Sequence, residues 1–248
     1  MKFCGIDLHS NNSVVVVTDE TDRVLLSRRC PNELAKILDL LEPHRNELVG
    51  AVVESTYNWY WLVDGLMAAG YEVRLANPVA MKRYDGLKHS DDKDDAAFLA
   101  HLLRLGILPT GYIHPPQERA LRDLARKRIQ LVRSRTQHIL AVENIMSRQF
   151  GERLSCNEVN ALSATSVDRL GLPTNVALAM KTNVAVIQAV QSQVDIIEDR
   201  LLHEISLRPE FSLLKTMLGI GEVLATVIML ETGNIERFAS VGNFASYA

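Results

Sequence analysis

Carboxylates follow two apolar runs near the N-terminus, and a dense group of them comes later. Residues 3–6 lead to Asp7, and residues 49–53 lead to Glu54. The group in residues 89–96 comprises Asp91, Asp92, Asp94 and Asp95. A buried strand gains nothing from a carboxylate at its end, because an unpaired buried charge is costly. Mg²⁺ requires oxygen ligands, so these acids predict a metal-dependent enzyme that cuts phosphodiesters.

The spacing of the acids selects four of them as candidate ligands. Asp92 and Asp95 are three residues apart at the start of an expected helix, so they share a face. If the strands before Asp7 and Glu54 are neighbours, their carboxylates emerge at one edge of a sheet. Such a cluster can hold two Mg²⁺ ions about 3.5–4 Å apart, one activating an oxygen nucleophile and one stabilising the leaving oxygen. Each acid alone is better explained as a turn or helix-start residue, and only the combination favours a metal site.

The elements that must position these acids alternate between strands and helices. Strands are expected at residues 2–8, 13–18, 23–29, 49–54 and 71–75. Asn32 is expected to cap the first of four helices, and the other three cover residues 57–69, 78–84 and 92–105. Three strands, helix, strand, helix, strand, helix is the order of a ribonuclease-H-like domain, an α/β fold that we place at residues 1–112.

From Pro115 onward the pattern changes to long helices. Residues 117–149 and 175–205 carry apolar residues, mostly three or four apart, which predicts one apolar stripe on each helix. The pair predicts an antiparallel helical arm over residues 113–208 that could form a coiled-coil dimer. Residues 209–248 are expected to begin a third, helical domain with a turn that resembles a helix-hairpin-helix.

The charge is unevenly distributed along the chain. The formal net charge of the 248 residues is −3, but residues 113–153 contain nine arginines and lysines against four acids. This local excess favours nucleic-acid contact over the alternative of a solvated helix face. The candidate phosphate-binding residues are Arg119, Arg122, Arg126, Lys127, Arg128, Arg133 and Arg135, with backbone N–H groups near Gly219 and Gly221.

The three cysteines have no CxxC spacing, so neither a disulfide framework nor a zinc knuckle is indicated. The N-terminus enters a strand pattern at once, without the features of a signal peptide. No apolar run reaches the roughly 18 residues that a membrane-spanning helix needs. These features predict a cytoplasmic protein with no membrane partner.

The same residues resemble the DEDD transposases of the insertion sequence 110 family, relatives of the Piv-type DNA invertases. The resemblance rests on Gly5-Ile6-Asp7, on Val53-Glu54 and on Asp92-Lys93-Asp94-Asp95-Ala96. The family's Asp-x-x-Asp-Ala motif falls here on Asp92 and Asp95. Residues 218–225 and 231–238 resemble the start of the family's C-terminal transposase domain.

The resemblance implies a RuvC-like N-terminal domain and Mg²⁺-dependent DNA cleavage and strand transfer in a bacterial or archaeal nucleoid. The implied partners are DNA and a guide RNA. The helical arm also predicts association with further copies of the chain, as a homodimer or a higher homo-oligomer. In the family a serine of the C-terminal domain also attacks DNA. The chain stops before the expected segment, and Ser246 does not fit the motif. We therefore expect a fragment that binds metal and nucleic acid without completing strand exchange.

Other classes stay open on the residues alone. A junction resolvase or a ribonuclease H would share the acids, although the long helices argue against both. An actin-like or sugar-kinase ATPase also begins with Gly-Ile-Asp, but Leu8-His9-Ser10-Asn11 lacks the glycine of its phosphate turn. A non-catalytic nucleic-acid-binding fragment is a further alternative. His9 is expected to form local hydrogen bonds and not to be a ligand.

Overall fold

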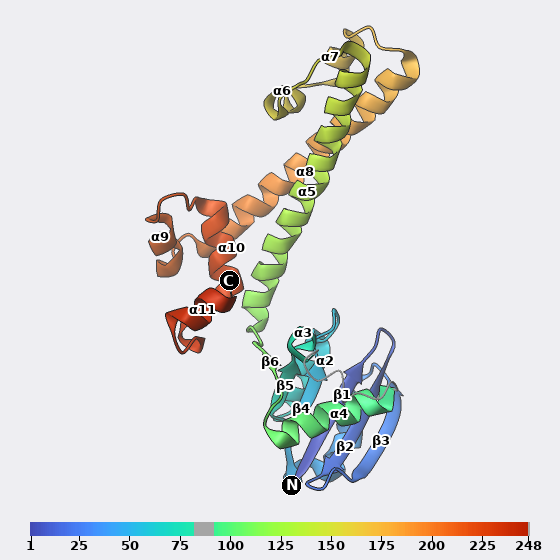
Figure 1. Ribbon diagram of the computed structural model, residues 1–248, viewed down its shortest axis with the longest axis vertical. Helices are drawn as coiled ribbons and strands as arrows, with labels where there is room; N and C mark the ends of the chain where they lie inside the picture. Colours follow the sequence, from blue (N-terminus) through green and yellow to red (C-terminus); the bar gives the residue numbers. More distant parts are fainter. Residues whose placement is uncertain (82–91, 248) are drawn as a thin grey trace. The chain divides into compact units, whose positions relative to one another are not determined.

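The computed structural model describes residues 1–81 and 92–247 (Figure 1). The chain forms two compact units, Met1–Ile113 and His114–Ala248. Among the residues that the structure describes, the strands all belong to the first unit, and the second is helical. This agrees with the α/β fold followed by helices that the sequence predicts. The further boundary at residue 208 stays a prediction.

The first unit is built on a six-stranded sheet of order β3-β2-β1-β4-β5-β6. Its first three strands form an antiparallel meander, β4 and β5 run parallel to β1, and β6 is antiparallel to β5. The strands are β1 (Lys2–Leu8), β2 (Asn12–Asp19), β3 (Val24–Pro31), β4 (Leu48–Glu54), β5 (Val73–Ala76) and β6 (Thr110–Gly111). This mixed sheet confirms the expected ribonuclease-H-like domain.

Helices cover both faces of the sheet because its central strands are apolar on both sides. Val15 and Val17 of β2 pack in the main core with α1 (Leu34–Leu41) and α2 (Tyr60–Ala68). Val14 and Val16, which alternate with them, contact Ala96 of α4 on the opposite face. Figure 1 shows α4 (Asp92–Leu105) crossing that face in front of β1 and β2.

A glycine in β1 determines how closely α4 approaches the sheet. A Cβ atom built on Gly5 would lie 1.9 Å from the Ala96 carbonyl oxygen and 2.9 Å from the Ala100 nitrogen. Both of these atoms belong to the α4 main chain, which cannot turn aside as a side chain can. Gly5 therefore allows α4 to lie directly on β1.

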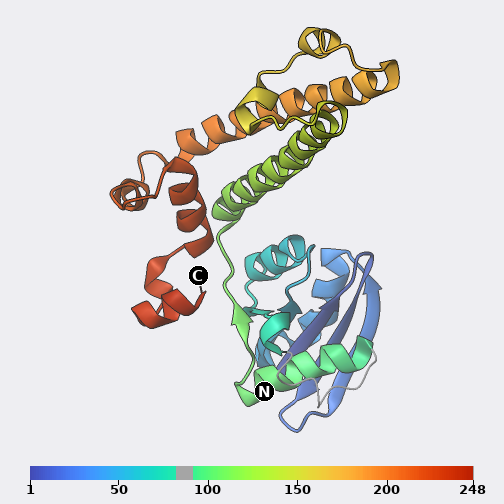
Figure 2. The same ribbon diagram turned by 45° about the horizontal axis from the view of Figure 1, so that its top comes forward.

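The second unit contains two long helices that run antiparallel beside each other, α5 (Pro116–Phe150) and α8 (Thr174–Ile205) (Figures 1 and 2). One core joins them to α6 (Cys156–Asn160) and α7 (Ala164–Asp168) near their connection. A second core joins their other ends to the C-terminal helices. Those helices are α9 (Pro209–Lys215), α10 (Glu222–Thr232) and α11 (Val241–Tyr247), with the 3₁₀ helix η3 (Ile235–Arg237) before α11.

Several element ends differ from the prediction. The N-cap of α1 is Glu33, and Asn32 instead bonds through its side chain to residues of the β1–β2 region. The chain continues after α1 as the 3₁₀ helix η1 (Glu42–Glu47). The expected helix at 78–84 is α3 (Pro78–Met81) in the described residues, and its remaining positions lie outside them. Among the described residues, no helix has the length and apolar character needed to cross a membrane.

Candidate active site

The ends of β1 and β4 place two of the predicted acids side by side. Asp7 faces the same side of the sheet as Gly5, towards α4, because alternate residues of a strand share a face. The parallel register pairs Ile6 with Val53, so Glu54 follows on the adjacent strand at the level of Asp7. Asp7 is buried and Glu54 is half-buried. Because β1 and β4 are neighbouring strands, the carboxylates of Asp7 and Glu54 lie at the same edge of the sheet.

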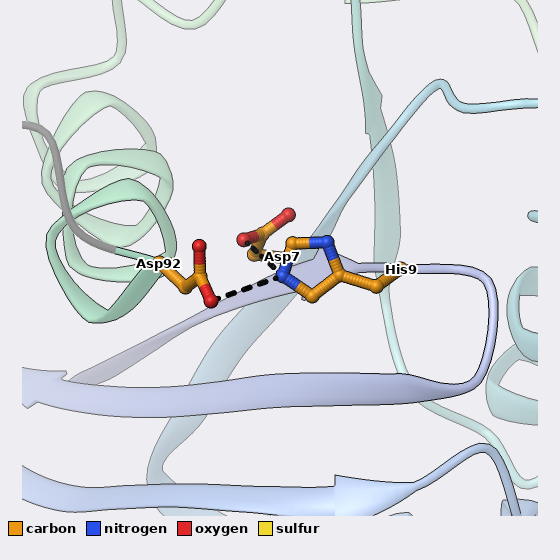
Figure 3. A group of neighbouring side chains, drawn as sticks. All are labelled: Asp7, His9 and Asp92. Atoms are coloured by element: carbon orange, nitrogen blue, oxygen red, sulfur yellow. Dashed lines mark ion pairs between the residues drawn. The ribbon is translucent and has the colours of Figure 1, made fainter.

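The first residue of α4 completes a compact group with the end of β1. Asp92 lies one helical turn before Ala96, the residue whose carbonyl packs on Gly5. The His9 Nε2 atom lies 3.2 Å from the Asp7 Oδ2 atom and 3.4 Å from the Asp92 Oδ2 atom (Figure 3). One potential ligand atom from each residue lies within 4.8 Å of the others. The close packing at Gly5 thus brings the N-terminus of α4 to the carboxylate of β1.

His9 is held in place by hydrogen bonds to its main chain. The side-chain amides of Asn32 and Asn58 both donate to its carbonyl oxygen at 2.9 Å. Its own N–H donates to the Asn12 carbonyl oxygen at 2.9 Å. The Ser13 hydroxyl donates to the Asn32 side-chain oxygen at 2.7 Å. His9 is therefore a fixed member of the group. In the sequence, the feature that places it near the site is its position two residues after Asp7.

Asp92 also has a cationic partner from the edge strand of the sheet. The Arg29 Nη2 atom binds the same Asp92 oxygen that contacts His9, and its Nη1 atom donates to the Asn12 side-chain oxygen at 2.8 Å. The hydrogen bond from Arg29 lowers the pKa of Asp92 below its ordinary value, although desolvation opposes this effect. Asp92 therefore carries a negative charge at neutral pH.

The other two predicted ligands lie outside this compact group. Glu54 ends β4, and Asp95 is half-buried in the first turn of α4. Asp94 is exposed, and Asp91 lies outside the described residues. The carboxylate oxygens of Asp7 and Asp92 already converge on the His9 Nε2 atom. Oxygen donors of this kind fit a hard divalent cation. Asp7 and Asp92 would hold such an ion directly, with Glu54 and Asp95 nearby.

The predicted basic interface divides into buried, paired and exposed residues. Arg119 is 2% exposed, Arg122 and Arg126 both bind Glu231 of α10, and Arg128 binds Glu198 of α8. Burial would raise the pKa of Glu231, but hydrogen bonds from Arg126 and Arg122 leave it lowered. These contacts stabilise the helical unit itself.

The remaining predicted contacts are more open to a ligand. Lys127 and Arg133 of α5 are exposed, and Arg135 is half-buried. Gly219 has a positive φ of 85°, and Gly221 is the N-cap of α10. A Cβ atom at either glycine would have no neighbour within 4 Å, so the turn between α9 and α10 is accessible.

A mixed sheet of this order, with acids at the ends of β1 and β4 and at the start of α4, defines a ribonuclease-H-like domain with an acidic site. Sequence profiles described as "Transposase" and "Transposase IS116/IS110/IS902 family" match residues 4–150 and 211–248. The chain belongs to the IS110 family of transposases.

A relative of this chain is the "Mini-circle putative transposase for IS117" of Streptomyces coelicolor. The two sequences are 31% identical over 112 residues, which cover 41% of this chain and 27% of the relative. The matched segment therefore spans little more than a quarter of the relative's length.

Proposed function

We propose that the chain carries the metal-dependent site of a DNA transposase, which cleaves DNA strands and transfers them, with Asp7, Glu54, Asp92 and Asp95 as catalytic ligands. The observation that supports this most directly is the convergence of Asp7 and Asp92 on one point, at 3.2 and 3.4 Å from the same His9 nitrogen. Membership of the transposase family supports DNA as the substrate.

The residues of the site would act mainly by holding and orienting charge. Asp7 and Asp92 would hold Mg²⁺, which would supply activation of an oxygen nucleophile and stabilisation of the leaving oxygen of a phosphodiester. Asp7 is fixed by its burial at the end of β1, and Asp92 is fixed by the close packing of α4 on Gly5. Asn32 and Asn58 hold the His9 turn beside them. A site whose ligands are held by their surroundings needs little rearrangement when substrate binds.

Metal binding tests this assignment independently of catalysis. We expect Asp7→Asn and Asp92→Asn each to weaken Mn²⁺ binding to the chain by at least about tenfold in calorimetric titrations, because each removes a charged ligand. Asp94→Asn is the matched control, since it removes the same charge from an exposed position on the same helix. The same variants are compared for metal-dependent nicking of DNA. Unchanged Mn²⁺ binding by both site variants would refute the metal assignment.

Glu54→Gln and Asp95→Asn test the outer members of the proposed set. We expect both to reduce nicking, and to weaken the binding of a second Mn²⁺ ion more than that of the first. The reason is that neither residue belongs to the compact group formed by Asp7, His9 and Asp92. Loss of the first binding event in these variants would instead place them in the primary site.

A guide RNA and a second copy of the chain are the further partners that we propose. Lys127 and Arg133 are the exposed candidates for phosphate contact on α5. Leu178 of α8 is 64% exposed and Leu140 of α5 is 51% exposed, which supports an association between helical arms. We expect Leu178→Glu to halve the mass measured by light scattering, whereas Leu207→Glu, outside the helices, leaves it unchanged. Equal masses for both variants would exclude an association through Leu178.

A further inference from the structure

Arg29 occupies an unusual position between the candidate site and solvent. It lies on β3, the edge strand of the sheet, and its side chain is 50% exposed. Its guanidinium binds the Asp92 Oδ2 atom, and Asn12 accepts a second hydrogen bond from it at 2.8 Å. The same Asp92 oxygen also lies 3.4 Å from the His9 Nε2 atom. Arg29 thus reaches an oxygen of the proposed metal site from the solvent side.

Two cations cannot share this oxygen equally well. If a divalent ion takes the Asp92 oxygen, Arg29 loses its charged acceptor and lies next to a like charge. Among the described residues, Asp92 is the carboxylate with which Arg29 forms an ion pair. A displaced guanidinium that stays anchored by Asn12 would need another anion within reach.

A phosphate of the nucleic acid is the anion that meets this need. The proposed reaction brings a phosphodiester to the metal, and a guanidinium matches the geometry of phosphate oxygens. The Arg29 side chain is 50% exposed, so a phosphate in solution can reach its guanidinium. In the metal-free state, by contrast, its charge is neutralised by Asp92, so it adds little attraction for a polyanion.

We propose that Arg29 is a phosphate-binding residue of this site, whose guanidinium exchanges between Asp92 and a nucleic-acid phosphate. The inference deepens the proposed function and rests on it for the metal-dependent step. An ordinary exposed ion pair, by comparison, contributes little to stability. Arg29 differs in that it contributes to nucleic-acid affinity only when its guanidinium is not bound to Asp92.

Binding measurements with and without a divalent cation test the exchange. The probes are a fluorescent DNA duplex and an RNA hairpin of equal length, titrated with the intact chain in Ca²⁺ or in EDTA. In Ca²⁺, we expect Arg29→Ala to weaken binding of at least one probe about tenfold and to reduce its salt dependence by roughly one phosphate contact. In EDTA the same variant should change affinity less than twofold. The probe that shows this pattern identifies the nucleic acid concerned.

Arg28→Ala is the matched control for the loss of charge. Arg28 is exposed on the same strand, and alternation places it on the opposite face of the sheet. We expect the same small change in affinity for this variant in Ca²⁺ and in EDTA. Equal losses from Arg29→Ala in both conditions, or none for either probe, would overturn the exchange.

A second measurement needs no metal and separates this inference from the proposed function. In EDTA, Asp92→Asn should release Arg29 and raise nucleic-acid affinity several-fold more than Asp94→Asn, which removes the same charge nearby. Adding Arg29→Ala to Asp92→Asn should abolish that extra gain. If Asp7→Asn and Asp92→Asn both leave Mn²⁺ binding unchanged but Asp92→Asn shows the gain, the metal assignment fails and the Arg29 assignment stands. If the gain is absent or survives Arg29→Ala, the Arg29 assignment fails.

Discussion

Replacing Gly5 with alanine is the sharpest test of how this fold builds its site. The added Cβ atom would lie 1.9 Å from the Ala96 carbonyl oxygen, whereas ordinary contacts at a Cβ begin at 3.4 Å. The main chain of α4 must therefore move by roughly 1.5 Å, because no side-chain rotation can relieve a contact with backbone. Overpacking of this kind costs about 1–3 kcal/mol or more. Alanine also reduces the conformational entropy of the unfolded chain, and this offsets less than about 1 kcal/mol of the lost stability.

The assay can follow the first unit alone, because both tryptophans of the chain, Trp59 and Trp61, belong to it. We expect Gly5→Ala to lower the free energy of unfolding by about 2 kcal/mol in urea titrations followed by tryptophan fluorescence, and Tm by roughly 10 °C. Movement of α4 should also carry Asp92 away from Asp7 and weaken Mn²⁺ binding.

Gly111→Ala is the control for this experiment, because it introduces the same methyl group on a strand of the same unit. Its Cβ atom would lie 3.7 Å from the nearest atom, an ordinary contact. If Gly5→Ala and Gly111→Ala unfold at the same urea concentration and bind Mn²⁺ equally, the argument that Gly5 controls the site is refuted.

Three further predictions concern stability. Burial, reinforced by Arg122, lowers the pKa of His114 to about 4, so below pH 6.5 the unfolded chain binds a proton that the folded chain does not. Helical circular dichroism should therefore show roughly 2 kcal/mol less stability at pH 5 than at pH 7, and His114→Gln should remove this loss. Asp22→Asn keeps a residue that tolerates the positive φ of 63° but loses the charged contacts to Arg104 at 2.7 and 2.6 Å, so the tryptophan signal should report about 1 kcal/mol lower stability. Met180→Ala, at a fully buried position of the second unit, should cost about 2–5 kcal/mol in the circular-dichroism transition and leave the tryptophan transition unchanged.

The sequence predicts well what local patterns determine. The bounds of β1 and α4 agree with the prediction, because each has a regular apolar pattern and α4 ends before a glycine with a φ of 68°. The short helices α6 and α7 were missed, although Ser155 and Glu158 form a capping box that the sequence displays at the start of α6. In that case the sequence contains a local signal for a helix between the two long helices.

The contacts of the site could not be predicted in the same way, because they join distant residues. Arg29 and Asp92 are 63 positions apart, and Asn58 is 49 positions from His9. Arg126, whose contact with phosphate stays a prediction, binds Glu231 from 105 positions away. A single sequence gives the charge of each residue but not the partner that tertiary packing supplies.

The pairing of Asp92 with Arg29, beside His9, bears on whether the protein can fold before it binds the proposed ion. Carboxylates gathered without counter-charges would repel one another and oppose folding until an ion arrived. Here the chain supplies its own cation to Asp92, and His9 lies between Asp92 and Asp7. Folding would therefore be separable from binding of the proposed ion, because the domain would not need that ion to reach its final form. A chelator should then remove the proposed ion without unfolding the protein.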